Sequence, residues 1–231
     1  MKIFETLGIP ASGKTTLIKR VLTEFKNVDA SFFDGRIDME IDEDLSRADP
    51  EKELENRIIS FNMSIYRHHK LFLQIERENV GILIFDRGVI DCGFVWPTAY
   101  HKVGHLSTAA KNKLYQSAVD LIQRNPNYLD TDITLFELPI EESIRRHTRT
   151  SVVDQVAMQK HVLDALRETY LELQQGYLLQ NVASTLPKNK NRECPENLFG
   201  KLAAMHERIR TINGTMQTDF NYERFKGYLD L

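Results

Sequence analysis

The most informative stretch of the sequence is "ETLGIPASGKTTLIKRVL", residues 5–22. It contains the pattern G-x-x-x-x-G-K-T from Gly8 to Thr15, which is the signature of a phosphate-binding loop. An apolar run precedes the pattern, and apolar residues recur at helical spacing after it. We therefore expect a short buried strand over residues 2–7 and a helix over residues 14–25, which is the context that such a loop requires.

The loop predicts a binding site for a nucleoside triphosphate and its metal ion. Its glycines let successive backbone N–H groups point inward at phosphate oxygens, and the following helix adds its positive N-terminal end. Lys14 is expected to reach the β- and γ-phosphates, and the hydroxyl of Thr15 is expected to bind Mg²⁺. The residues expected to bind the nucleotide are Gly8, Ile9, Pro10, Ala11, Ser12, Gly13, Lys14, Thr15 and Thr16.

The size and charge of the chain exclude several classes of protein. Its 231 residues fit one α/β domain, and 42% hydrophobic residues are enough for a sizeable core. A net charge of -3 gives no indication of polymeric nucleic acid or a membrane surface as a partner. No apolar run approaches the roughly 18 residues that a membrane helix needs. Cys92 and Cys194 form no metal or disulfide pattern, so we expect a cytoplasmic protein without a signal peptide.

The remaining pattern alternates strands with long helices. It predicts an α/β fold of three layers, with a parallel sheet of about five strands and helices on both faces. We expect a single domain over residues 1–231, ending in a divergent helical segment over about 181–231 whose aromatic tail packs on the body. "NVAST", residues 181–185, is a weak candidate for the fifth strand. Further strands are expected at 29–36, 81–88 and 132–139, and further helices at 52–79, 107–124, from about 141, 155–179 and 195–212.

A second candidate site lies in "GILIFDRG", residues 81–88. Four apolar residues lead directly into Asp86 and Arg87, an arrangement typical of a buried strand that ends at a catalytic edge. An acidic residue there is expected to lie near the magnesium ion of a phosphate-binding loop. Arg87 would face the phosphate-transfer zone, where an arginine holds the oxygen of an acceptor or of the transferring phosphoryl group.

A third candidate site is the basic cluster "RRHTR", residues 145–149. Arg145 and Arg149 are four residues apart and share one face of the expected helix. Like charges at this spacing repel each other unless an anion lies between them. We expect a lid over about 141–155 whose arginines close over the triphosphate and stabilise charge in the transition state.

Taken in this order, the three sites resemble the thymidylate kinase and deoxynucleoside kinase group of P-loop kinases. The matching stretches are "GIPASGKTT", "LIFDRGVIDCGFVW" and "LFELPIEESIRRHTR". In the last of these, arginines follow Pro139 by six and ten residues, as in the group. The resemblance covers about residues 1–180 and implies transfer of the γ-phosphoryl group of ATP, with Mg²⁺, to a nucleoside or a nucleoside monophosphate. It also makes a homodimer through long helices plausible.

Carried over by position, the resemblance assigns roles to individual residues. Lys14, Asp86, Arg87, Arg145 and Arg149 would be catalytic, with Thr15 and Asp86 at the metal. Asp34, at the end of the second strand, would face the acceptor and act as general base in a nucleoside kinase. The long helix before "GILIFDRG" lines the acceptor pocket in this group. Residues proposed to bind the acceptor are Asp34, Phe61, Asn62, Tyr66, Arg67, Arg87 and Asp91, with His68 nearby.

The sequence departs from the group mainly around the acceptor. The second strand lacks the usual Glu-Pro turn, and Gly88 follows Arg87 where the group has serine or an aromatic residue. Asp91 and Cys92 occupy the region that holds the base in deoxynucleoside kinases, without matching the residues of that group.

Other functions remain open at this point. A P-loop kinase of an antibiotic, sugar or cofactor precursor would share the loop, Asp86 and the lid. A nucleotide-binding regulator without transfer activity would share the loop alone. A switch GTPase is disfavoured because "NKNR", residues 189–192, lacks the aspartate of its guanine-reading motif. A motor-type ATPase is disfavoured because "DR" is not the acidic pair expected after its strand.

Overall fold

Five parallel strands form one sheet in the computed structural model of the chain. The structure describes residues 2–24, 30–34, 61–62, 64–73, 81–147, 158–185, 197–215 and 218–229. The strands are β1 (Lys2–Gly8), β2 (Ala30–Asp34), β3 (Ile82–Asp86), β4 (Asp132–Glu137) and β5 (Ile209–Asn213). Their order is β2-β3-β1-β4-β5, and every neighbouring pair is parallel. The expected parallel sheet of about five strands is therefore confirmed.

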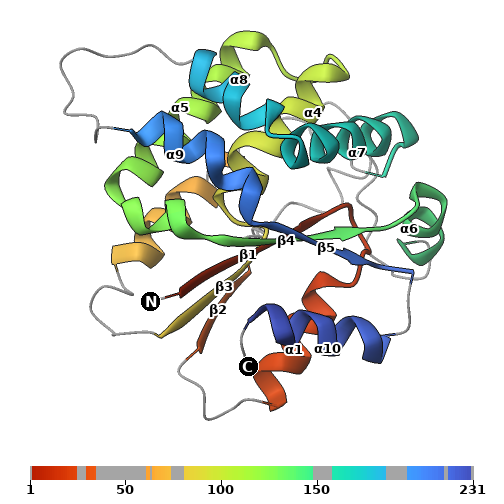
Figure 1. Ribbon diagram of the computed structural model, residues 1–231. Helices are drawn as coiled ribbons and strands as arrows, with labels where there is room; N and C mark the ends of the chain where they lie inside the picture. Colours follow the sequence, from red (N-terminus) through yellow and green to blue (C-terminus); the bar gives the residue numbers. More distant parts are fainter. Residues whose placement is uncertain are drawn as a thin grey trace.

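Helices cover both faces of the sheet, as Figure 1 shows. On one face lie α1 (Lys14–Glu24) and α10 (Thr218–Tyr228). The other face carries α4 (Trp96–Lys102), α5 (Thr108–Arg124), α7 (Lys160–Gln174), α8 (Tyr177–Thr185) and α9 (Leu198–Ala204). A further helix, α6 (Ile140–His147), follows the carboxyl end of β4. This arrangement confirms the predicted three layers.

Alternation along β1 divides the core in two, because successive side chains of a strand point to opposite faces. Ile3 and Leu7 join the larger cluster, which lies under the face that carries α4, α5, α7, α8 and α9 (Figure 1). Phe4 joins the smaller cluster under α1 and α10, together with Phe225. The predicted packing of the C-terminal tail on the body is confirmed, since Phe225 and Leu229 are buried.

The site-forming edge of the sheet follows from the strand register. In the parallel pairing, Thr6 of β1 lies opposite Asp86 of β3 on one side and Thr134 of β4 on the other. Asp34 of β2 lies opposite Asp86. The carboxyl ends of β1, β2, β3 and β4 therefore meet at one edge, which is where ligands bind in open α/β sheets.

The C-terminal part differs from the prediction. Residues 181–185 lie in α8, so the candidate strand there is wrong. The helix predicted over 195–212 is also wrong in its second half, because α9 is followed by a 3-10 turn (Met205–Arg208) and then by β5. The reason is that β5 is an edge strand in which Ile212 alone is buried, so its sequence contains no apolar run.

The helix predicted over 155–179 is divided into α7 and α8 at Gly176. Gly176 has φ +80°, and a Cβ there would lie 2.9 Å from the ring of His206, so the break needs glycine. Of the helix predicted over 52–79, residues 61–62 and 64–73 are helical, and the rest lies outside the described residues. Within the described part of the chain, no helix has the length and apolarity needed to cross a bilayer.

Candidate functional site

The phosphate loop has the backbone that its glycines predict. Gly8 has φ +139°, and Gly13 has φ +93°. A Cβ on Gly8 would lie 2.4 Å from the carbonyl oxygen of Phe136 on β4, so a side chain cannot be accommodated there. Ala11 also has a positive φ, of 57°, which is uncommon outside glycine. The loop is thus tightly curled against the end of β4.

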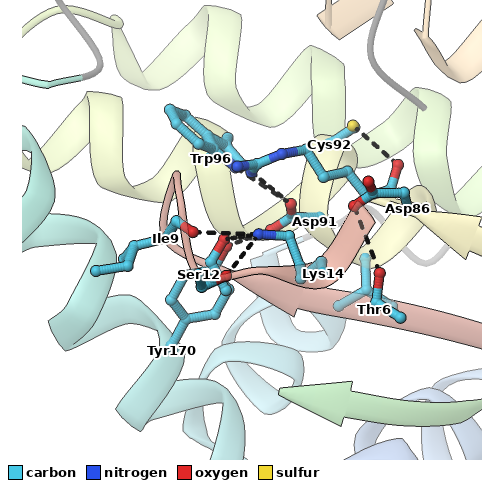
Figure 2. A network of polar contacts seen from close by, with 12 residues as sticks. Thr6, Ile9, Ser12, Lys14, Asp86, Asp91, Cys92, Trp96 and Tyr170 are labelled. Atoms are coloured by element: carbon cyan, nitrogen blue, oxygen red, sulfur yellow. Dashed lines mark hydrogen bonds and ion pairs between the residues drawn. The ribbon is translucent and has the colours of Figure 1, made fainter. Parts of the chain in front are cut away.

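Lys14 lies inside this curl (Figure 2). Its side chain is buried, and Nζ donates to the carbonyl oxygens of Gly8 at 3.0 Å and Ile9 at 3.1 Å and to Oγ of Ser12 at 2.9 Å. The ammonium group is therefore held by the loop that is predicted to bind phosphate. The ammonium group gives the loop a positive charge that is well suited to receive an anion.

Thr15 and Asp86 meet although they are 71 residues apart in the sequence. The hydroxyl of Thr15 donates to Oδ2 of Asp86, and Asp86 is almost completely buried. On the other side, Thr6 Oγ1 donates to the carbonyl oxygen of Phe85 at 3.1 Å and lies 3.5 Å from Oδ1 of Asp86. The structure therefore brings together the two residues that the sequence predicts at the metal.

The donor set of Thr15 and Asp86 fits magnesium. Mg²⁺ prefers oxygen ligands and is usually held by one or two protein carboxylates plus waters and substrate phosphates. A hydroxyl and a carboxylate beside a phosphate loop provide that set. No group of three or more His, Cys, Asp or Glu side chains placed to hold a metal occurs among the described residues, and a site of this kind does not require one.

Arg87 is fixed in a buried network just beyond Asp86. Its Nη1 donates to Oδ2 of Asp91 at 3.0 Å, and its guanidinium lies 5.0 Å from the ring centre of Trp96. Asp91 also accepts from Trp96 Nε1 at 3.2 Å and from the Tyr170 hydroxyl at 2.7 Å. Figure 2 shows Asp91, Trp96 and Tyr170 converging beside Lys14 and the loop. Asp91, predicted to bind the substrate, is thus occupied by three donors of the chain itself.

The charge state of this network follows from its partners. Burial raises the pKa of the Asp91 carboxyl, whereas the guanidinium of Arg87 and the hydroxyl of Tyr170 lower it. Burial alone would lower the pKa of Arg87, but the charge of Asp91 raises it above its usual value. Since Arg87, Trp96 and Tyr170 all donate to the Asp91 carboxyl, the ionised pair fits the site.

Within the basic cluster on α6, Arg145 and Arg146 differ in exposure and in the groups that they contact. Arg145 is exposed, and its Nε donates to Glu142 at 2.6 Å. Arg146 also donates to Glu142, through its Nε at 2.7 Å. Its other nitrogens reach the phosphate loop and the turn after β5, where they donate to the carbonyl oxygens of Ala11 at 3.5 Å and Gly214 at 2.9 Å. The spacing from Pro139 in the kinase group points to Arg145 and Arg149, so it does not single out Arg146. Arg149 lies outside the described residues.

The residues predicted to bind the acceptor are placed less uniformly. Phe61 is buried, with its ring 6.4 Å from that of Trp96, so it lies close to the Arg87 network. Asn62 and Tyr66 are exposed, and Arg67 is half-buried. Asp34 ends β2 beside Asp86 in the backbone register, and its side chain lies outside the described part of the chain.

His68 is a core residue in the structure. It is completely buried, its Nδ1 lies 2.6 Å from the carbonyl oxygen of Ser64, and its ring packs 4.9 Å from that of Phe85. Burial lowers the pKa of His68 to about 4, so the imidazole is neutral at physiological pH. A neutral, packed imidazole of this kind contributes to the core.

A cavity of about 340 Å³ adjoins the phosphate loop at the carboxyl ends of β4 and β5. Ile9 of the loop and Tyr170 of the Arg87 network both line it. Its volume is within the range of sites for small organic groups. The other lining residues are Leu135, Phe136, Glu137, Leu138, Pro139, Arg167, Leu171, Gln174, Asn213 and Thr215.

The comparisons with known proteins support the fold. No protein-family model matches the sequence, and no curated protein matches it. Solved structures of deoxyadenosine kinase from M. mycoides match over the whole chain. The structure with bound dATP has a TM-score of 0.64 at 12% identity and is covered over 100% of its length. The structures with bound dCTP and with the products dCMP and dCDP have TM-scores of 0.67 and 0.66 at 11% and 14% identity, with 99% covered. At these identities the likeness shows a shared fold, as the sequence resemblance predicted.

Proposed function

We propose that this chain is a P-loop phosphotransferase that moves the γ-phosphoryl group of ATP to a nucleoside or a nucleoside monophosphate. The observation that carries the proposal is the contact between Thr15 and Asp86 beside the buried ammonium of Lys14. Two stretches that are far apart in the sequence meet there in the arrangement that phosphoryl transfer requires. The shared fold with a deoxyadenosine kinase supports a nucleoside as acceptor.

In this proposal the phosphate loop binds the triphosphate. Backbone N–H groups of the loop and the N-terminal end of α1 face the phosphate oxygens. Lys14 exchanges its contacts with Gly8, Ile9 and Ser12 for contacts with the β- and γ-phosphates. Thr15 and Asp86 would hold Mg²⁺, which supplies positive charge to the phosphates when it is bound.

Arg87 is proposed to stabilise charge on the transferring group. Its side chain is 13% exposed, and Asp91 and Trp96 fix its direction before any ligand arrives. A cation that is already oriented loses little entropy when the reaction begins, so it contributes to catalysis by preorganisation. Arg146 on α6, which contacts the loop, and Arg145 and Arg149, as the resemblance implies, are proposed to act from the lid side.

The acceptor is proposed to lie against the helix that contains residues 61–68. The similar structures of that other enzyme hold both purine and pyrimidine deoxynucleotides, so candidate acceptors should include both. One observation favours a second candidate function. Because the carboxylate of Asp91 is filled by Arg87, Trp96 and Tyr170, it is not available to a nucleobase in this conformation. A P-loop kinase of a different small molecule would fit this departure.

The decisive experiment is an acceptor screen. The protein is incubated with ATP and Mg²⁺ and with separate pools of nucleosides, nucleoside monophosphates and other metabolites, and new products are identified by mass. We expect a phosphorylated nucleoside or nucleotide with the unmodified protein, and none with Lys14→Ala. Lys160→Ala is the matched control, because this exposed lysine on α7 pairs with Asp164 away from the loop. If a metabolite without a nucleobase is the sole product, the second candidate replaces the first.

A further inference from the structure

Glu5 is a carboxyl group buried in the central strand of the sheet. It stands three residues before Gly8, the first glycine of the phosphate loop, and it is completely buried. Ile3 and Leu7, which flank it on the same face of β1, belong to the larger apolar core. A carboxyl group in such surroundings needs hydrogen-bond donors, because burial removes its contacts with water.

Those donors are backbone N–H groups at the start of the helix after Arg87. Oε1 of Glu5 accepts from the N–H of Asp91 at 2.9 Å, and Oε2 accepts from the N–H of Ile90 at 3.3 Å. Oε2 of Glu5 is also hydrogen-bonded to the hydroxyl of Tyr128. One side chain of β1 is therefore bonded to the segment that carries Asp91.

The pattern of bonds is that of a helix cap supplied from a distance. The chain is helical from Val89 on, and the N–H of Cys92 is bonded within the helix to the carbonyl oxygen of Gly88 at 3.0 Å. Residues 89–91 come before this bond, so their N–H groups have no partner within the helix. The Tyr128 hydroxyl accepts from Val89 at 2.9 Å, and Glu5 accepts from the other two. Together the two side chains satisfy all three groups.

Gly88 explains why the cap comes from another strand. The residue at the start of a helix is ordinarily Ser, Thr, Asp or Asn, whose side chain bonds the first free N–H groups. Gly88 has no side chain, and a Cβ there would lie 2.5 Å from both Cδ and Oε2 of Glu5. The carboxyl of Glu5 thus occupies the space in which a side chain of residue 88 would lie.

We propose that Glu5 is a positioning residue that sets Arg87 relative to the phosphate loop. Glu5 holds the backbone of Asp91, and the carboxylate of Asp91 holds the guanidinium of Arg87 at 3.0 Å. The N–H of Arg87 donates to the carbonyl oxygen of Thr6, the next residue on β1, at 3.1 Å. Residues of β1, the strand that leads into the loop, therefore position both the backbone and, through Asp91, the side chain of Arg87. The position of Arg87 is inferred from geometry alone. The effect of that position on phosphoryl transfer rests on the proposed function.

Variants of Glu5 and Tyr128 test the proposal against a matched pair on the other face of the sheet. Glu5→Gln keeps one oxygen but replaces the other by an amide nitrogen, which cannot accept from the backbone N–H group opposite it. Tyr128→Phe removes the hydroxyl. The controls are Glu24→Gln and Tyr222→Phe, because the hydroxyl of Tyr222 donates to Glu24 between α10 and α1. This second tyrosine–glutamate contact lies away from Arg87.

The first readout needs no activity. Trp96 is the single tryptophan of the chain, is almost completely buried and contacts both Arg87 and Asp91. Acrylamide quenching of its fluorescence therefore reports the packing of the Arg87 network. We expect more quenching in Glu5→Gln and Tyr128→Phe than in the unmodified protein, and no change in the controls. Unchanged quenching in both site variants would overturn the proposal even if the protein transferred no phosphate.

The second readout separates positioning from general stability. With an acceptor from the screen, we expect Glu5→Gln to lower kcat by about tenfold to hundredfold while the KM for ATP changes by less than about threefold. Both controls should keep kcat. A rise in KM for ATP without loss of kcat would contradict the proposal, because it would indicate damage to the phosphate loop rather than to Arg87.

A double variant tests the contact with Gly88. Gly88→Ala alone brings a Cβ against the carboxyl of Glu5, and Glu5→Ala removes that carboxyl. We expect acrylamide to quench Trp96 fluorescence no more strongly in the double variant Glu5→Ala/Gly88→Ala than in Glu5→Ala alone. Independent, additive effects of the two substitutions would show that Glu5 does not occupy the space at residue 88.

Discussion

Replacing Asp91 by asparagine tests whether the Arg87 network is as tightly coupled as the structure indicates. Asn keeps the shape of Asp and one oxygen, which can still accept the hydroxyl of Tyr170. Its amide nitrogen takes the place of Oδ2, which accepts from Arg87 at 3.0 Å and from Trp96 at 3.2 Å. Both partners are donors, so both bonds are lost in this orientation of the amide. In the flipped orientation the oxygen can accept from them, but the negative charge is still absent, so in either case Arg87 remains as a nearly buried cation without the charge of Asp91.

The expected cost follows from these two bonds. A hydrogen bond to a charged group contributes about 1.5 to 3 kcal/mol, so losing two lowers the free energy of unfolding by about 3 kcal/mol or more. Removing one partner of a buried ion pair costs a similar amount, about 3 to 5 kcal/mol. With a typical urea dependence, the midpoint of unfolding falls by on the order of 1 M.

Urea unfolding followed by far-UV circular dichroism measures this change without relying on Trp96, which is part of the network. Asp164→Asn is the control, because Asp164 and Lys160 form an exposed i,i+4 pair on α7 at 2.8 Å. A surface pair of this kind contributes less than about 1 kcal/mol. If Asp91→Asn is no more destabilising than Asp164→Asn, the claim that the network fixes Arg87 is refuted.

Three further predictions concern other parts of the site. Because burial raises the pKa of Glu5 to about 8 from 4.5, the folded protein retains a proton that the unfolded chain releases. The free energy of unfolding should therefore fall between pH 4.5 and 8, by up to about 1.4 kcal/mol per pH unit, and Glu5→Gln should flatten this slope in urea titrations. Asp86→Asn should abolish Mg²⁺-dependent transfer and weaken the binding of Mg²⁺ in the presence of ATP, measured by calorimetry. Unchanged turnover would show that Asp86 does not hold the metal ion. Gly8→Ala should prevent stable folding or ATP binding, whereas Gly104→Ala, also at positive φ but with open space around it, should cost about 1 kcal/mol in thermal unfolding. Equal effects of the two glycine variants would contradict the close packing of the loop on β4.

The sequence predicted those parts of the fold in which a local pattern and a tertiary role coincide. The strand, loop and helix from residue 2 to 24 were predicted because the loop signature and the flanking apolar runs agree with one another. The strand β5 was missed because an edge strand with Ile212 as its one buried residue carries no apolar run. The break between α7 and α8 depends on Gly176, and a single glycine within an amphipathic pattern does not by itself predict where a helix ends.

The residues of the site also divide into those that a local sequence pattern predicts and those that it does not. Thr15 and Asp86 were expected at one metal, and the structure brings them into contact. The placement of Arg146 against the loop could not be predicted, since adjacent arginines on a helix differ only in the direction they face. The role of Glu5 depends on Asp91, which is 86 residues away, so no local pattern shows it. A signal was nevertheless present, because a carboxyl group inside an otherwise apolar strand requires partners.

Transfer of an isotopic label tests the central claim most directly. ATP carrying ¹⁸O in its γ-phosphoryl group is incubated with the protein, Mg²⁺ and the acceptor found in the screen, and the products are analysed by mass. The proposal predicts that the phosphorylated nucleoside or nucleotide carries the label, and that Lys14→Ala forms no labelled product. Label that appears exclusively in inorganic phosphate, or remains in ATP with every acceptor tested, would contradict the assignment of this site to phosphoryl transfer.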